Sequence, residues 1–263
     1  MRKIRKCNNT DEKGLLDFLN SKPVYHTFII ADIKQYGFDQ EFQDVYVQEE
    51  EEKIQGVFLR YFNNFIVAGN GEELLYDEIA GLVDSSVTTI MGCADIVDGI
   101  SEKLSCKVNV IYNNLYTHED PVDSHWKEGC TYAGLEDVDR IHQFLMSFPE
   151  FATMYAEKGM IVNRLQNKEG VHLFIEKDGK IIAHGNSAAS ADKTCMMGGI
   201  SVEEGLRGQG YGKKILLSLC SEILDSGKIP CIFASEKADY SCFRETGFKV
   251  YGRWGVAQLK QEI

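Results

Sequence analysis

The most informative stretch of this sequence is SVEEGLRGQGYGKK, residues 201–214. The run before it, residues 195–202, is typical of a strand, and residues 209–226 carry apolar side chains on one helical face. A strand, a glycine-rich turn and a helix therefore follow one another. Because the first N–H groups of a helix have no intrahelical acceptor and lie at the positive end of its dipole, the turn predicts a phosphate-binding site.

Three nucleotide-binding patterns can be compared with this turn. A Walker-A loop needs glycine, four residues and then Gly-Lys-Ser/Thr, but Arg207 stands at the first position and Lys214 at the last. The dinucleotide fingerprint G-x-G-x-x-G fails because Lys213 or Ile215 stands where its last glycine belongs. The spacing that does match is Arg207-x-x-Gly-x-Gly212.

This spacing resembles the signature of the GNAT superfamily of N-acetyltransferases, [Arg/Gln]-x-x-Gly-x-[Gly/Ala]. The resemblance extends from about residue 131 to residue 260, since Phe243-Arg-Glu-Thr-Gly-Phe248 is similar to the family's Tyr-x-x-x-Gly-Phe and ends at the right distance. It implies an α/β (α+β) fold, the GNAT fold, in which helices flank a mixed central β-sheet. It also implies acetyl-CoA as the co-substrate.

The resemblance further implies which residues contact acetyl-CoA. The backbone of Ile200, Ser201 and Val202 would pair with the pantetheine arm, while Ser235 and Phe243 would lie near the thioester sulfur. The turn would hold the pyrophosphate through Arg207, Gly208, Gln209, Gly210, Tyr211, Gly212 and Lys213.

Acetyl transfer to an amine requires the neutral nucleophile. An alkylammonium has a pKa near 10.4, so only about one molecule in 2,500 is neutral at pH 7. A general base is therefore expected, together with a proton donor for the departing thiolate. The candidate bases are Glu203, at the end of the central strand, and His184, in the strand after a hairpin; a solvated turn carboxylate and a structural sheet histidine are the alternatives.

The family's usual proton donor, a tyrosine, is replaced here. The matching position is Phe243, which has no proton to give. Tyr240 lies one helical turn earlier on a similar face and is the candidate substitute. The alternative is that Tyr240 is an ordinary packing aromatic residue.

The N-terminal half repeats part of the same order of elements, more weakly. A strand, the turn Gly69-Asn-Gly71, a helix over residues 72–83 and further elements recur at similar spacings, which indicates either internal duplication or a coincidence within an α/β chain. The turn lacks the arginine and the spacing of a working site. We therefore expect two tandem domains, a degenerate GNAT-like domain over residues 1–128 and a catalytic GNAT domain over residues 129–263.

The periodicity and turn residues of the chain predict further elements. The C-terminal half should contain a hairpin at Asp178-Gly179, and Pro149 should separate two helices. The same signals predict helices over residues 135–147, 151–166 and 238–245. They also predict strands over residues 107–112, 115–118, 248–251 and 253–259.

Charge and composition exclude several classes of protein. The formal net charge of −12 argues against binding to nucleic acid, and no apolar run approaches the length of a membrane span. The eight cysteines have no C-x-x-C pair and no histidine at metal-ligand spacing, so no metal is expected. With no apolar segment after the basic N-terminus, a cytoplasmic location and reduced thiols are expected.

The sequence as a whole predicts an N-acetyltransferase that moves an acetyl group from acetyl-CoA directly to a primary amine of a small molecule or peptide. The alternative is a non-catalytic acyl-CoA-binding sensor module, in which the missing tyrosine reflects lost chemistry. Because the turn is expected in both, it does not discriminate between them. The sequence leaves a homodimer open.

Overall fold

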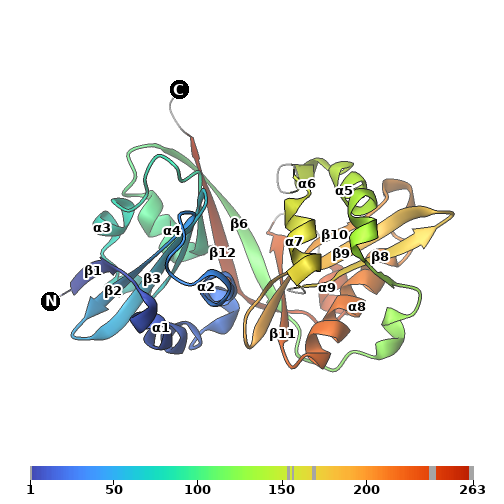
Figure 1. Ribbon diagram of the computed structural model, residues 1–263, viewed down its shortest axis with the longest axis horizontal. Coiled ribbons are helices and arrows are strands. Elements are labelled where there is room, and N and C mark those ends of the chain that lie inside the picture. Colours follow the sequence, from blue (N-terminus) through green and yellow to red (C-terminus); the bar gives the residue numbers. More distant parts are fainter. Residues whose placement is uncertain (1, 153–154, 156, 168–169, 237–240, 261–263) are drawn as a thin grey trace. The chain divides into compact units, whose positions relative to one another are not determined.

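The computed structural model describes residues 2–152, 155, 157–167, 170–236 and 241–260 (Figure 1). The chain forms two compact units. Unit 1 comprises Met1–Tyr116, Phe233–Ala238 and Val250–Ile263; unit 2 comprises Thr117–Ile232 and Asp239–Lys249. The last strand therefore belongs to the unit that the N-terminal half builds. A division into continuous domains, residues 1–128 and 129–263, stays a prediction.

Unit 1 contains a mixed sheet of strand order β1-β2-β3-β4-β5-β12-β6. Neighbours from β1 to β4 are antiparallel, β4 and β5 are parallel, and β12 is antiparallel to β5. Its core contains Phe58, Phe65, Ile90 and Val97, all fully buried. The elements are β1 (Arg2–Lys6), the 3-10 helix η1 (Asn9–Asp11), α1 (Glu12–Leu19), α2 (Pro23–Tyr36), β2 (Gln43–Glu50), β3 (Lys53–Tyr61), β4 (Asn64–Gly69), η2 (Gly71–Glu73), α3 (Tyr76–Ala80), β5 (Thr89–Cys93), α4 (Ala94–Ser101), β6 (Lys107–Thr117) and β12 (Lys249–Lys260).

Several predicted boundaries in unit 1 are wrong. The helix predicted over residues 72–83 is instead η2 and the short α3, because Leu74 between them is extended. The two predicted strands at residues 107–118 form the single strand β6, and those at residues 248–259 form β12, since neither the asparagines of the first pair nor Gly252 interrupts the extended chain.

The strands of unit 2 lie in the order β11-β10-β9-β8-β7. Among the pairs that the described residues form here, β10 and β11 are parallel and the others are antiparallel. The elements of unit 2 are η3 (Ser124–Lys127), β7 (Thr131–Tyr132), η4 (Leu135–Asp137), α5 (Val138–Met146), α6 (Pro149–Ala152), α7 (Gly159–Asn167), β8 (His172–Lys177), β9 (Lys180–Ser190), β10 (Thr194–Val202), η5 (Glu204–Leu206), α8 (Tyr211–Asp225), β11 (Ile229–Ser235) and α9 (Ser241–Glu245).

Helices cover both faces of the strands of unit 2 (Figure 1). On one face Ile141 of α5 and Ile161 of α7 pack in a core with Phe174 of β8. On the other face α8 lies so close to β9 that a methyl group on Gly185 would stand 2.5 Å from Ile215. The turn before α8 is therefore held by a helix that is packed firmly against the sheet.

The helices before β8 differ from the prediction. Residues 151–166 do not form one helix, because α6 and α7 are separate and Pro149 begins α6. Proline is tolerated at the first position of a helix, where its missing N–H would have no acceptor. The predicted helix at residues 238–245 is described only from Ser241 to Glu245, since residues 238–240 lie outside the described residues.

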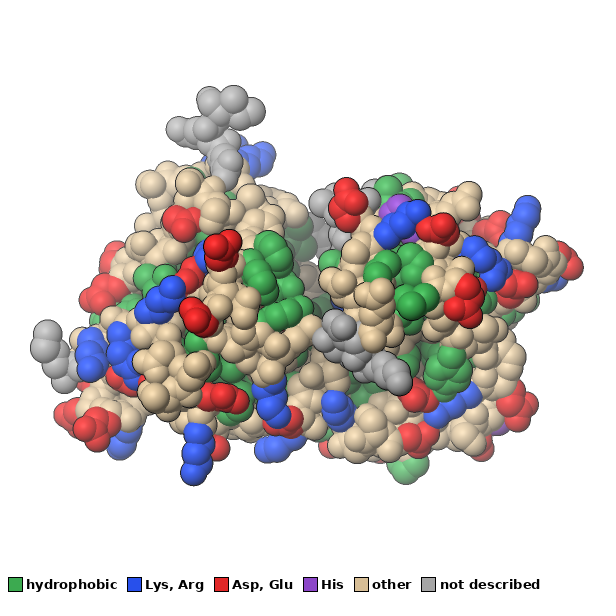
Figure 2. Space-filling model, in the orientation of Figure 1, with side chains coloured by type: hydrophobic (Ala, Val, Ile, Leu, Met, Phe, Trp, Pro, Cys, Tyr) green, Lys and Arg blue, Asp and Glu red, His purple; other side chains and the backbone are tan. Residues whose placement is uncertain are grey.

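No helix in the described ranges is both long and apolar enough to cross a membrane. On the face that Figure 2 shows, acidic and basic side chains are intermixed over each unit. The described cysteines are all free thiols, and Cys220 and Cys231 are buried within α8 and β11, where they pack as small apolar residues.

Candidate functional site: an anion-binding turn beside an open strand edge

The glycine-rich turn links the end of β10 to the start of α8. Gly208 and Gly210 have φ values of 77° and 88°, in the left-handed region that favours glycine. Nothing lies within 4 Å of the position that a Cβ atom would occupy at either residue. A ligand can therefore approach the main chain closely at both positions.

The main-chain N–H groups of this turn are unpaired over a continuous run. Arg207 N donates to Glu204 O at 3.3 Å, and Lys214 N donates to Gly210 O at 3.0 Å. The N–H groups of residues 208–213 have no acceptor within the described residues. Because these donors lie at the start of a long helix, they form a concave set of positive dipoles that can receive an anion.

Basic side chains add charge to the turn. Arg207 is exposed, and its Nε donates to Val202 O at 3.3 Å, which holds the guanidinium beside the end of β10. Lys213 is also exposed, and its Nζ lies 5.6 Å from the centre of the Trp126 ring. Two cations and a run of free amides together suit a ligand with more than one negative charge.

The edge of β10 beside the turn is open. β10 pairs with β11 only from Thr194 to Met196, although β10 continues to Val202; beyond Met196 the described strands provide no partner on this edge. On the other edge a β-bulge places Gly199 and Ile200 opposite Gly185 alone. The open edge thus offers main-chain hydrogen-bonding groups next to the anion-binding turn.

The residues predicted from the family resemblance are placed as follows. Ile200, Ser201 and Val202 lie at the end of β10, and Tyr211 and Gly212 begin α8. Phe243 on α9 is buried against Phe248, with the two ring centres 5.5 Å apart. Ser235 differs from these residues because it ends β11 in a segment that belongs to unit 1.

The candidate catalytic residues differ in their surroundings. Glu203 is exposed directly after β10, and its N–H donates to Ile182 O at 2.9 Å. Tyr240 lies outside the described residues. His184 is fully buried, and burial lowers its pKa from 6.5 to about 4, although its bond to the Gly199 carbonyl opposes this.

A buried polar cluster around His184 escaped the sequence analysis. His184 Nδ1 lies 3.0 Å from Gly199 O, and its Nε2 lies 2.9 Å from His172 Nδ1. Nearby, Tyr155 Oη donates to Asn186 Oδ1 at 3.1 Å. Burial, followed by the charge of His184, lowers the pKa of His172. The sequence signal for this cluster was the pair Gly198-Gly199 inside a strand, which is typical of a bulge.

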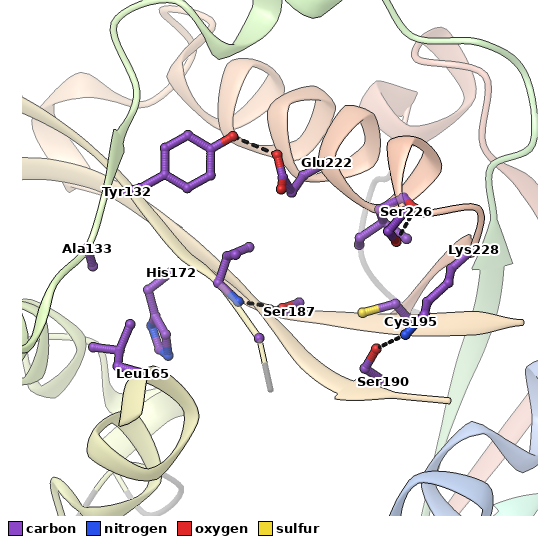
Figure 3. Close-up of a pocket in the computed structure, with 13 residues that line it drawn as sticks. Tyr132, Ala133, Leu165, His172, Ser187, Ser190, Cys195, Glu222, Ser226 and Lys228 are labelled. Atoms are coloured by element: carbon purple, nitrogen blue, oxygen red, sulfur yellow. Dashed lines mark hydrogen bonds between the residues drawn. The ribbon is translucent and has the colours of Figure 1, made fainter. Parts of the chain in front are cut away.

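A pocket of about 360 Å³ lies elsewhere in unit 2, toward the C-terminal end of α8 (Figure 3). Tyr132 Oη donates to Glu222 Oε2 at 2.6 Å on one side, and Lys228 Nζ donates to Ser190 Oγ at 2.6 Å on another. Because α8 is roughly 22 Å long at 1.5 Å per residue, this pocket is remote from the turn. No group of three or more His, Cys, Asp and Glu side chains in the described ranges is placed to hold a metal.

The fold and the turn define unit 2 as an α/β domain with unpaired N–H groups at the N-terminus of a long helix, beside an open strand edge. Comparison with known families identifies it further. Residues 135–248 match the model of the acetyltransferase (GNAT) family. This part of the chain is a GNAT domain.

Solved structures show the same fold over nearly the whole chain. A GNAT-family acetyltransferase from Colwellia psychrerythraea is 16% identical, with a TM-score of 0.57, and the match covers 98% of this chain and 100% of that one. A GCN5-related N-acetyltransferase-like protein from Streptococcus suis is 14% identical, with a TM-score of 0.60 and coverages of 95% and 99%.

A tandem GNAT protein from the clavulanic acid biosynthesis pathway is 9% identical, with a TM-score of 0.60, and the match covers 100% of both chains. The predicted fold class, a mixed sheet with flanking helices in the GNAT fold, is confirmed. No curated protein matches this sequence.

Proposed function

We propose that this protein is an N-acetyltransferase that transfers an acetyl group from acetyl-CoA directly to a primary amine of a small molecule or peptide. The observation that carries the proposal is the run of unpaired N–H groups at residues 208–213, in which residues 208–210 and 213 are exposed. The pyrophosphate of acetyl-CoA has the charge and the two linked phosphates that such a run can bind. Membership of residues 135–248 in an acetyltransferase family supports the same activity.

The cofactor contacts follow from this placement. The turn residues Arg207 to Lys213 bind the pyrophosphate, and the open edge of β10 at residues 200–202 pairs with the pantetheine arm. Glu203, exposed at the end of that strand, is the candidate general base that takes the proton of the ammonium, directly or through water. Tyr240 remains the candidate proton donor for the CoA thiolate.

A second candidate function is a non-catalytic acyl-CoA sensor. One observation favours it: Phe243, which stands at the family's tyrosine position, is buried and has no hydroxyl group to donate. Measurement of thiol release from acetyl-CoA across a panel of primary amines separates the two functions. An enzyme releases thiol in proportion to an amine of the panel, whereas a sensor binds acetyl-CoA without amine-dependent turnover.

Calorimetry of acetyl-CoA binding tests the site itself. The double substitution Arg207→Ala with Gly210→Ala removes the cation and adds a Cβ atom where φ is positive, so acetyl-CoA binding is expected to weaken at least about 100-fold. The control is Lys180→Ala with Gly159→Ala, which removes a charge at the hairpin and adds a methyl group in open space. Unchanged affinity in the first variant would refute the assignment of the turn.

A further inference from the structure

The carbonyl group of Gly199 is fixed by two side chains. It accepts hydrogen bonds from His184 Nδ1 at 3.0 Å and from Ser201 Oγ at 3.2 Å. Gly199 itself is buried in the bulge of β10 with a φ of 59°. Because rotation of the Gly199–Ile200 peptide would break both bonds, the orientation of this peptide is set by the two side chains.

The fixed peptide directs the N–H of Ile200 toward the open edge of β10. The described chain has no cis peptide bond, so the Ile200 N–H points opposite to the Gly199 carbonyl. The pairing of β10 with β9 supports this direction of the Ile200 N–H, because Glu203 N donates to Ile182 O and Ser201 pairs with His184. Main-chain groups of residues 201 and 203 therefore face β9, and those of residue 200 face away from it.

The partners of the two histidines determine their tautomers. A carbonyl can only accept, so His184 carries its proton on Nδ1 and donates it to Gly199 O. His184 Nε2 is then an acceptor, and His172 Nδ1 must donate to it. The result is a directed chain of hydrogen bonds from β8 through β9 to the bulge of β10, with both rings neutral.

We propose that His184, held in its tautomer by His172, is a positioning residue that orients and polarises the Ile200 N–H as a donor to the thioester carbonyl of acetyl-CoA. This inference rests on the proposed function. When the amine nitrogen forms a bond to the thioester carbon, the C=O π electron pair moves to oxygen. The C–S bond breaks as that pair returns to form the C=O bond again; the nitrogen gives up a proton to the general base, and the leaving thiolate takes one from the proton donor. A donor whose own carbonyl is hydrogen-bonded is a stronger donor to the developing oxyanion, and one that is already oriented requires no reorganisation.

The surroundings of His184 oppose the role of general base. Both of its ring nitrogens are engaged, and it is fully buried. The groups that face it are neutral or cationic: His172 from β8, the neutral Asn186 that pairs with Tyr155, and the charge of Arg164 from α7, which disfavours protonation of either histidine. His184 thus keeps a neutral ring across the pH range in which amines are acetylated.

Two substitutions of similar size test the donor at this position. His184→Asn keeps an N–H donor one bond from Cγ, where Nδ1 stands, whereas His184→Leu removes it. For turnover with the amine that gives thiol release, we expect kcat to fall about 10-fold or more in H184L while the KM for acetyl-CoA changes less than about 3-fold. H184N should recover most of the loss, and the shape of the pH–rate profile should not change in either variant. Loss of the acidic limb in both variants would make His184 the base and overturn the inference.

A readout without turnover separates this inference from the proposed function. Isotope-edited infrared spectra of [1-13C]acetyl-CoA report a hydrogen bond to the thioester carbonyl as a lower stretching frequency than in solution. We expect the shift in the wild-type protein and in H184N, and a smaller shift in H184L and, by loss of the second bond, in Ser201→Ala. Equal shifts in all four proteins would overturn the inference and leave the proposed function intact. Absence of acetyl-CoA binding to the wild-type protein would overturn both.

Discussion

At the scale of single residues, Gly199 is a position of the site that has no room for a side chain. A methyl group there would stand 2.5 Å from Asn186 Oδ1 and 3.2 Å from Tyr155 Oη, and its φ of 59° disfavours any other residue. Gly199→Ala is therefore expected to lower the free energy of unfolding by about 2–4 kcal/mol, from backbone strain and overpacking together. Urea unfolding measures the difference.

The neighbouring glycine is the matched control for this prediction. A methyl group on Gly198 would lie 3.7 Å from Ala188 Cβ, which is ordinary contact, and its φ is not positive. Gly198→Ala should change the free energy of unfolding by less than about 1 kcal/mol. Equal decreases in the free energy of unfolding for Gly199→Ala and Gly198→Ala would show that the bulge accommodates a side chain at residue 199.

The residues of the turn were predictable from the sequence because each acts locally. An arginine, two spaced glycines and a following helix form their site from contiguous chain. The role of His184 was not predictable in this way. With the two-residue hairpin at Asp178-Gly179, an uninterrupted register would pair His184 with residue 173 and place it on the face opposite to His172. The bulge at Ile182 shifts the pairing to Phe174 with His184 and so brings both imidazoles to one face.

At the scale of elements, the position of α8 depends on the absence of a side chain at Gly185. A Cβ atom there would lie 2.5 Å from Ile215 Cγ2 and 2.9 Å from Leu219 Cδ1, both on α8. We expect Gly185→Ala to destabilise the protein by about 1–3 kcal/mol, because the helix must move away from β9. Thermal or urea unfolding provides the measurement.

A double-mutant cycle tests whether the loss of stability in Gly185→Ala comes from the contact with α8. Ile215→Ala alone leaves a cavity, but in the Gly185→Ala background it also relieves the clash. The two changes together should therefore destabilise the protein by less than the sum of the single changes, with a coupling of about 0.5–3 kcal/mol. Strict additivity would mean that α8 accommodates the methyl group without moving.

The helix that periodicity located and the one that it missed differ in the spacing of their apolar residues, not in their burial. In α8 the apolar side chains of residues 216, 219, 220 and 223 recur at a helical period, although every residue from Ile215 to Ser221 is buried. α2 buries Ile29, Ile30 and Ile33 without such a period, so its helix was not predictable from the sequence pattern. Its place in the fold depends on tertiary contacts that the pattern does not display.

At the scale of the whole molecule, the two units should respond differently to acid. In unit 2 the buried His172 and His184 have lowered pKa values, the latter about 4. In unit 1 burial lowers the pKa of His26 to about 4, but desolvation also raises the pKa of the half-buried Asp32 from 3.8 to about 7. Between pH 6.5 and pH 4, unfolding of unit 2 thus takes up protons at two histidines, whereas in unit 1 the uptake at His26 is offset by release from Asp32.

These numbers of protons determine how the free energy of unfolding of each unit changes with pH. A unit whose unfolded state takes up protons becomes less stable as the pH falls, in proportion to the number of protons. The free energy of unfolding of unit 2 should therefore fall by up to about 2.7 kcal/mol per pH unit through this window, whereas that of unit 1 should change little. The chain has two tryptophans, Trp126 in unit 2 and Trp254 in unit 1. Urea titrations of Trp254→Phe and Trp126→Phe, followed by fluorescence at pH 7 and pH 5, therefore report on unit 2 and unit 1 separately. Equal losses in the two single-tryptophan proteins would contradict the prediction.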